Sequence, residues 1–254
     1  IAYRKQGKGV PIVFVHGFGE DSRIWDEFLE RFSDNYKMVL IDLLGFGQSE
    51  VLENNSVEDM AEVVHRVITA LKIKQCILIG HSMGGYVSLA FAERYGNMLL
   101  GMCLFHSHPY EDTAEKKKGR QKGIDFINRF GHTLYVKQLI PKLFAKDFAN
   151  DNQLLIEKLS FNANQYSGEG IIGGLEAMKN RSDRSKVLKE VECPVLFIVG
   201  KKDVAVPEKS SMEQLYLPSI ASIHILPKVG HMGMFEAPKK CYLIIKNFIE
   251  FCKV

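Results

Sequence analysis

The chain has 254 residues, of which 46% are hydrophobic and 25% are charged, and its 33 Lys and Arg against 30 Asp and Glu give a formal net charge of +3. These fractions are typical of globular domains and do not fit a disordered or collagen-like chain. The small net charge does not fit the strongly basic surface of a nucleic-acid-binding domain.

The cysteines indicate the kind of compartment. They are odd in number and widely spaced, without a CxxC pair, so we expect free thiols and neither a disulfide framework nor a zinc site. No stretch approaches the roughly 18 apolar residues of a membrane-spanning helix. Residues 1–10 lack the charged-then-apolar pattern of a secretory leader. We therefore expect a cytoplasmic protein with no membrane span. The five cysteines are Cys76, Cys103, Cys193, Cys241 and Cys252.

Short apolar runs alternate with longer amphipathic segments, the pattern of a mostly parallel, twisted sheet with helices on both faces. The apolar runs predict strands over 11–15, 38–41, 76–79, 99–105, 195–199 and 222–226. Apolar residues at helical spacing predict helices over 22–32, 57–71, 83–95, 207–217 and 237–251. Ser56, with Asp59 in the following turn, is the expected N-cap of the helix over 57–71. The sequence thus predicts an α/β fold.

Residues 107–185 interrupt this alternation. The segment holds no strand-like run, and its pattern predicts helices over 114–130, 133–144, 152–165 and 168–180. An all-helical insert between two strands is expected to form a lid over one edge of the sheet. We therefore divide the chain into a core, residues 1–106 and 186–254, and a lid, residues 107–185.

The lid carries the charge excess of the whole chain, because it holds 13 Lys and Arg against 10 Asp and Glu. One interpretation is a solvated helical face. The other is a lid that steers an anionic substrate or an acidic carrier.

The sharpest chemical signal is the run Gly80-His-Ser82-Met-Gly84, a G-x-S-x-G motif between a predicted buried strand and a predicted helix. In a nucleophile elbow the serine occupies a strained turn, and the glycines leave room for close backbone packing. The motif predicts that Ser82 is a nucleophile.

A serine hydroxyl needs a base to take its proton, and that base needs an acid to orient and support it. Asp203 follows the predicted strand 195–199, and His231 follows the predicted strand 222–226. Both residues then lie at the carboxyl ends of parallel strands, where open α/β sheets place their sites. Ser82, Asp203 and His231 form the predicted catalytic triad, and their chain order is that of α/β-hydrolases.

The sequence resembles the α/β-hydrolase superfamily over essentially the whole chain. His16-Gly17 resembles the family's His-Gly loop, and residues 42–49 resemble its D-x-x-G-x-G-x-S turn, with Phe46 where many relatives carry His or Tyr. The resemblance implies an oxyanion hole made by the backbone N–H groups of Phe18 and Met83. Within the superfamily, the lid and residues 180–184 resemble small carboxylesterases of the pimeloyl-carrier-protein methyl ester type and 3-oxoadipate enol-lactonases.

Other residues are candidates for weaker roles. Phe18 and His108 are candidate substrate-binding residues, while His16 and His81 are expected to brace loops. His106 and His108 form an H-x-H pair, but no Cys or carboxylate cluster accompanies it, so we expect no metal. The glycine-rich turns lack the spacing of G-x-x-x-x-G-K-[ST] or a complete G-x-G-x-x-G, so we expect no nucleotide cofactor.

The leading hypothesis is a cofactor-free serine hydrolase that cleaves a small carboxylic ester or lactone through an acyl-enzyme on Ser82. Acyltransferase, perhydrolase, carbon–carbon bond hydrolase and hydroxynitrile lyase activities share the triad and remain open. A ligand-sensing receptor with a hydrolase fold is a further alternative, as is a lipase acting at a membrane surface.

Overall fold

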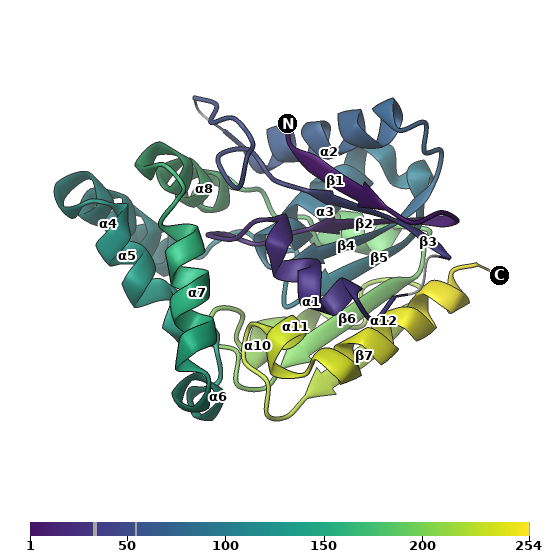
Figure 1. Ribbon diagram of the computed structural model, residues 1–254. Helices are drawn as coiled ribbons and strands as arrows, with labels where there is room; N and C mark the ends of the chain where they lie inside the picture. The colour runs from purple at the N-terminus through teal and green to yellow at the C-terminus, as the bar shows by residue number, and fades with distance from the viewer. Residues whose placement is uncertain (33–34, 54, 254) are drawn as a thin grey trace.

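A seven-stranded sheet runs through the centre of the computed structural model, which describes residues 1–32, 35–53 and 55–253 (Figure 1). The strands lie in the order β1-β3-β2-β4-β5-β6-β7, and all neighbours are parallel except β1, which is antiparallel to β3. This confirms the predicted mostly parallel α/β sheet. The strands are β1 (Tyr3–Gln6), β2 (Val10–Val15), β3 (Tyr36–Ile41), β4 (Cys76–His81), β5 (Leu99–Phe105), β6 (Val195–Gly200) and β7 (Ala221–Leu226).

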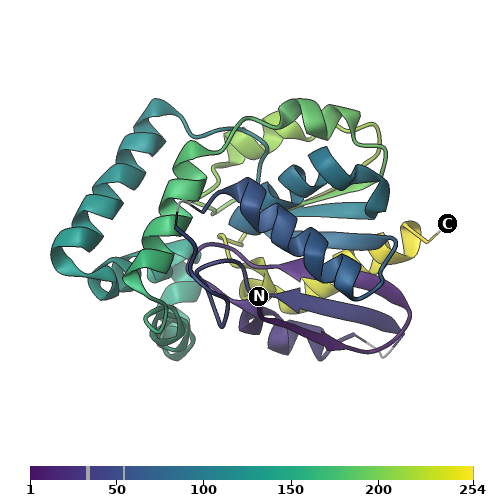
Figure 2. The ribbon, with the colours of Figure 1, turned by 90° about the horizontal axis from the view of Figure 1, so that it is seen from above.

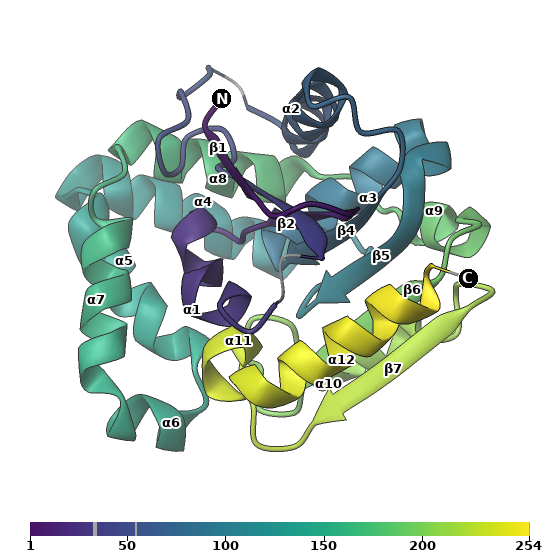
Figure 3. The same cartoon turned by 45° about the vertical axis from the view of Figure 1, so that its right-hand side comes forward.

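Helices cover both faces of the sheet. In Figure 3, α1 and α12 lie in front of the strands, whereas α2, α3 and α9 lie behind them. The core helices and 3-10 turns are η1 (Ser22–Trp25), α1 (Asp26–Leu29), α2 (Val57–Ala70), α3 (Met83–Tyr95), η2 (Gly96–Met98), α9 (Ser185–Glu190), α10 (Glu208–Gln214), α11 (Gly233–Glu236) and α12 (Pro238–Phe251).

The sequence at the first turn of α2 explains why the helix begins there. The Ser56 hydroxyl accepts a hydrogen bond from the Asp59 N–H at 3.1 Å, and the Asp59 carboxylate accepts one from the Ser56 N–H at 3.1 Å. This capping box satisfies two donors that a helix start otherwise leaves unpaired. The N-cap predicted at Ser56 is confirmed.

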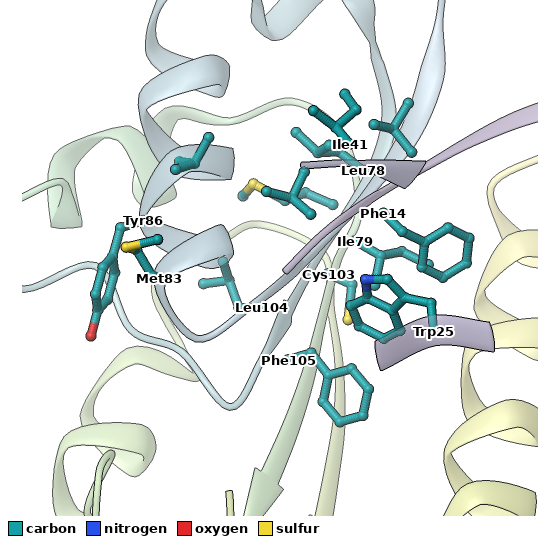
Figure 4. Close-up of a cluster of buried hydrophobic side chains, with 14 of the residues drawn as sticks. Phe14, Trp25, Ile41, Leu78, Ile79, Met83, Tyr86, Cys103, Leu104 and Phe105 are labelled. Atoms are coloured by element: carbon teal, nitrogen blue, oxygen red, sulfur yellow. The ribbon is translucent and has the colours of Figure 1, made fainter. Parts of the chain in front are cut away.

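Large apolar side chains fill the space between sheet and helices. Figure 4 shows Phe14, Trp25 and Phe105 gathered on one side of the strands and Met83 and Tyr86 on the other. Phe14 and Trp25 are fully buried, with ring centroids 5.2 Å apart. All five cysteines are free, as their spacing predicts, and all five are buried. This packing holds the strand ends that carry the candidate site.

The lid is all-helical, as predicted, and its helices stand together beside the sheet (Figures 1 and 2). The pattern over 133–144 overestimated one helix: α5 ends at Leu139, and the next turn, which contains Pro141, is a 3-10 helix. No described helix is long and apolar enough to cross a membrane. The lid elements are α4 (Ala114–Phe130), α5 (His132–Leu139), η3 (Ile140–Leu143), α6 (Lys146–Asp151), α7 (Gln153–Ala163) and α8 (Gly168–Asn180).

Candidate active site

The candidate site lies where the strand order reverses. From β2 the chain goes to β3 on one side, and β4 to β7 then add on the other side. The carboxyl ends of β2 and β4, which pair with each other, lead into the loop at residues 16–19 and into Ser82. Ligands of open α/β sheets bind in the crevice at such a switch point.

Ser82 occupies a strained turn between β4 and α3. Its φ is 51° and its ψ is −114°, a conformation that costs a non-glycine residue about 1 to 3 kcal/mol. A Cβ on Gly80 would lie 2.3 Å from the Gly84 carbonyl oxygen, and a Cβ on Gly84 would lie 2.4 Å from that of Val15. The two glycines of the motif therefore let the strand, the turn and the helix approach one another.

Replacing Gly84 with alanine is expected to destabilise the protein by about 1 to 3 kcal/mol, because the added methyl group overlaps the carbonyl oxygens of Val15 and His16. Since the clash displaces the Ser82 turn, any catalytic activity that depends on Ser82 should fall as well. Urea unfolding and initial rates measure both effects. Gly96→Ala is the matched control, because a Cβ there meets nothing within 4 Å. Equal stability losses in the two variants would contradict this account.

Asp203 and His231 are brought together from separate loops. The His231 Nδ1–H donates to Asp203 Oδ2 at 2.7 Å, and the N–H groups of Ala205 and Val206 each donate to Asp203 Oδ1 at 2.9 Å. Burial alone would raise the pKa of Asp203, but the attraction of His231 and the neighbouring donors hold it well below its usual range. The aspartate is therefore a carboxylate, and the bond to it fixes the tautomer of His231 that leaves Nε2 unprotonated.

The end of β5, which lies between β4 and β6 in the sheet, holds the Ser82 turn. Ser82 N–H donates to the Phe105 carbonyl at 2.9 Å, and the Ser107 hydroxyl donates to the Ser82 carbonyl at 2.7 Å. His106, between them, has a φ of 52°, and its Nδ1 lies 3.5 Å from Asp203 Oδ2. Burial lowers the pKa of His106 to about 4, so its ring is neutral. Sequence reasoning placed His106 in an H-x-H pair and missed its position beside the acid.

Nitrogen and oxygen donors of His106, Asp203 and His231 lie within 4.8 Å of one another, a set that suits a metal ion by residue type. The 2.7 Å bond between Asp203 and His231, however, uses two of these donors for each other. The hydrogen bond therefore joins the Asp203 and His231 loops directly.

Two backbone N–H groups close to Ser82 in the structure are the expected oxyanion donors, those of Phe18 and Met83. Within the described residues, neither the Phe18 nor the Met83 N–H donates a hydrogen bond to protein. The loop holding Phe18 touches the turn, since a Cβ on Gly17 would lie 3.1 Å from the Ser82 Cβ. Met83 opens α3, so its N–H carries the partial positive charge of a helix N-terminus. This arrangement can receive a developing oxyanion.

The histidines expected to brace loops make specific bonds. His16 Nε2 accepts from the Leu43 N–H at 2.9 Å, and His16 Nδ1 lies 2.7 Å from the Gly17 carbonyl, to which it donates. His81 bonds Glu20 and the His231 carbonyl. Sequence reasoning missed Glu20, which lies 61 residues from His81 in the chain and belongs to no motif.

A cavity of about 180 Å³ lies between the lid and the loops of the site. It is lined by Gly19, which follows Phe18, and by Met232, which follows His231. Across its outer edge, Lys158 on α7 and Glu27 on α1 approach to 3.6 Å. The rest of the lining includes the apolar side chains Ile24, Ile140, Leu155, Leu159 and Phe235.

His108 lies apart from that cavity. It is 3% exposed, its Nδ1 accepts from the Tyr110 N–H at 3.2 Å, and its Nε2 lies 3.5 Å from the Tyr86 hydroxyl. Burial and the nearby Arg181 guanidinium lower its pKa to about 3. The structure thus places His108 against a buried charged cluster at the base of the lid, and its role in substrate binding stays a prediction.

Comparison with known proteins gives consistent matches. The family model described as alpha/beta hydrolase fold matches residues 10–238. A pimeloyl-acyl-carrier protein methyl ester esterase of Wigglesworthia glossinidia brevipalpis is 29% identical over 98% of this chain and 97% of its own. A 2-succinyl-6-hydroxy-2,4-cyclohexadiene-1-carboxylate synthase of Escherichia coli K12 is 26% identical over 98% of each chain. Among solved structures, a thermophilic esterase from Thermogutta terrifontis, with malate bound, has a TM-score of 0.94 and 27% identity, covering 100% of this chain and 94% of its own.

Proposed function

Because the chain belongs to the α/β-hydrolase family and is an esterase-like hydrolase of it, we propose that it cleaves small carboxylic esters or lactones through an acyl-enzyme on Ser82. The observation that carries the proposal is the 2.7 Å bond from His231 Nδ1 to Asp203, at the sheet edge where Ser82 occupies its strained turn. In this proposal the three residues act as nucleophile, base and acid.

The first half-reaction forms the acyl-enzyme. Ser82 Oγ attacks the ester carbonyl while its proton passes to His231 Nε2. The Asp203 carboxylate stabilises the resulting imidazolium, and the Phe18 and Met83 N–H groups hold the oxyanion of the tetrahedral intermediate. When that intermediate collapses, the alcohol leaves with the proton from His231, and Ser82 keeps the acyl group.

The second half-reaction restores the enzyme. A water molecule gives one proton to His231 Nε2 and its oxygen attacks the acyl carbon, after which the acid leaves and Ser82 Oγ recovers the proton. No hydrogen bond joins the Ser82 hydroxyl to His231 among the described residues. Such contacts are often long in unliganded hydrolases and tighten when substrate binds, so their absence does not count against the roles.

The cavity supports a small substrate. A cavity of about 150 Å³ accommodates a molecule of benzene's size, and the cavity here has about 180 Å³. Its lining combines apolar side chains with charged ones of both signs, so the lining alone does not distinguish a neutral group from a charged one. The charged residues are Glu20, Asp21, Arg23, Asp26, Glu27 and Lys158.

Labelling with a fluorophosphonate tests the proposed mechanism, and a series of p-nitrophenyl esters tests the substrate. We expect one fluorophosphonate adduct, on Ser82, and a kcat/KM that is highest for acyl chains of a few carbons. Folded protein that fails to label at Ser82 would refute the mechanism. Rates that rise with chain length and with added lipid surface would favour the lipase, and a ligand-dependent rise in Tm without turnover would favour the receptor.

A further inference from the structure

His81, the residue directly before Ser82, makes two hydrogen bonds, and each of them requires a hydrogen on a ring nitrogen. Its side chain is fully buried, its Nδ1 lies 2.9 Å from Glu20 Oε2, and its Nε2 lies 2.8 Å from the His231 carbonyl oxygen. A carboxylate and a carbonyl can only accept, so each ring nitrogen must carry a hydrogen. A neutral imidazole has one N–H, so these bonds describe an imidazolium.

Glu20 extends the arrangement to a second part of the site. The oxygen that accepts from His81 also accepts from the Gly17 N–H at 2.7 Å. Gly17 precedes Phe18, whose N–H is a donor of the proposed oxyanion hole. One buried carboxylate and one buried imidazolium therefore connect the loop of that donor with the backbone of His231.

We propose that Glu20 and His81 are positioning residues, which form a buried ion pair and by its charge hold the Phe18 loop and the His231 loop in register with Ser82. The proposal rests on the serine-hydrolase function above and adds residues that act on the catalytic groups without touching the reacting atoms. It predicts that the site loses its alignment when His81 loses its proton.

Burial disfavours the charged forms of His81 and Glu20, but for each residue the attraction of the other outweighs the effect of burial. Burial alone would lower the pKa of His81, but the attraction of Glu20 and its hydrogen bond raise it. Burial alone would raise the pKa of Glu20, but His81 lowers it. A single buried charge costs several kcal/mol, so both residues must be charged or both neutral. The titratable or charged groups around the His81 ring and its partner are Glu20, His231, His106, Asp203 and His16.

The direction of each shift defines the range of pH over which the pair exists. Since the pKa of His81 is raised on folding, its contribution to stability is full below the ordinary histidine value and is lost as the pH rises through the folded value. Since the pKa of Glu20 is lowered, its contribution is lost as the pH falls through its own folded value. Between these limits the pair is intact.

Nuclear magnetic resonance of the full chain, labelled with ¹⁵N-histidine, tests the charge directly. We expect both ring nitrogens of His81 to carry hydrogen at neutral pH, where an ordinary histidine is mostly neutral. His81→Gln identifies the signals. A single neutral tautomer of His81 at neutral pH would overturn the proposal.

Glu20→Gln tests the link to catalysis, because the amide oxygen can accept both bonds without carrying a charge. The pKa of His81 should then fall, and the alkaline decline of kcat should move to lower pH with it, while KM changes little. Glu62→Gln is the matched control, since Glu62 bonds Tyr95 and Arg66 near the surface.

The outcomes separate this proposal from the proposed function. An unchanged pH profile in Glu20→Gln, or an equal displacement in the control, would refute the positioning role. If Glu20→Gln does not fold, the resonance experiment on the native chain still decides the charge. If fluorophosphonate fails to label Ser82, the function is wrong, and that result leaves the state of His81 in the native chain unaffected.

Discussion

Replacing Ser82 with alanine is expected to lower kcat for ester hydrolysis by about a million-fold, the loss seen when a serine nucleophile is removed from an intact triad. The variant should fold normally, because the backbone bonds of the turn, from Ser82 N–H to Phe105 and from Ser107 to the Ser82 carbonyl, do not use the hydroxyl. Removing Oγ also leaves no atom for a fluorophosphonate to modify.

Initial rates with a short-chain p-nitrophenyl ester measure the effect, with Tm as the test of folding. Ser210→Ala on α10 is the control, since Ser210 is half-buried and far along the chain from the motif. A loss below about tenfold in Ser82→Ala would mean that another nucleophile acts, and it would remove the acyl-enzyme mechanism.

The residues predicted for the site came from local signals. Gly80, Ser82 and Gly84 lie within five positions of the chain because the turn itself needs small residues, and a single local motif is enough to predict it. Asp203 and His231 were predicted from their places after apolar strands, and the structure joins them by a 2.7 Å hydrogen bond. Their catalytic roles stay predictions until the variants are measured.

The residues that sequence reasoning missed are held by long-range contacts. Glu20 meets His81 across 61 positions of the chain, and His106 meets Asp203 from a neighbouring strand end. Glu20 belongs to no motif, and the H-x-H spacing of His106 does not indicate that it lies beside Asp203. A pattern along the chain cannot reveal which side chains the sheet order brings together.

One strand and several short helices were missed because their sequences show no periodic apolar pattern. Strand β1, with sequence YRKQ, has four exposed residues on the edge of the sheet, so no apolar alternation marked it. Helices α6, α9 and α11 span only four to six residues, too few to show helical periodicity. The predicted helix over 22–32 is a 3-10 turn followed by the short α1, which ends at Leu29.

The charge excess of the lid has a partly structural explanation. Arg181 and Arg120 both bond the carboxylate of Asp112, and Lys116 donates to the Ala205 carbonyl at 3.3 Å. These residues lie where the chain leaves the core for the lid and where it returns: Arg181 also donates to the Tyr110 carbonyl at 3.1 Å. Part of the positive charge thus fastens the base of the lid, and that part is not free to steer an anionic substrate.

Replacing Asp112 with alanine is therefore expected to destabilise the protein by about 3 to 5 kcal/mol, the cost of removing one partner from a buried charged pair. The Asp112 side chain is fully buried and that of Arg181 is 1% exposed, so water cannot replace the carboxylate without opening the base of the lid. Urea unfolding at neutral pH measures the difference.

The neighbouring residue supplies a matched control. Glu111 pairs with Lys117 at 2.7 Å, but both side chains are about half exposed, so Glu111→Ala should cost less than about 1 kcal/mol. Burial alone would raise the pKa of Asp112, but Arg120 and Arg181 lower it. The stability that the carboxylate contributes is therefore lost only as the pH falls through that lowered pKa. The difference in free energy of unfolding between the native protein and Asp112→Ala should therefore become smaller at acidic pH. If the two alanine variants lose equal stability, the buried cluster does not hold the lid.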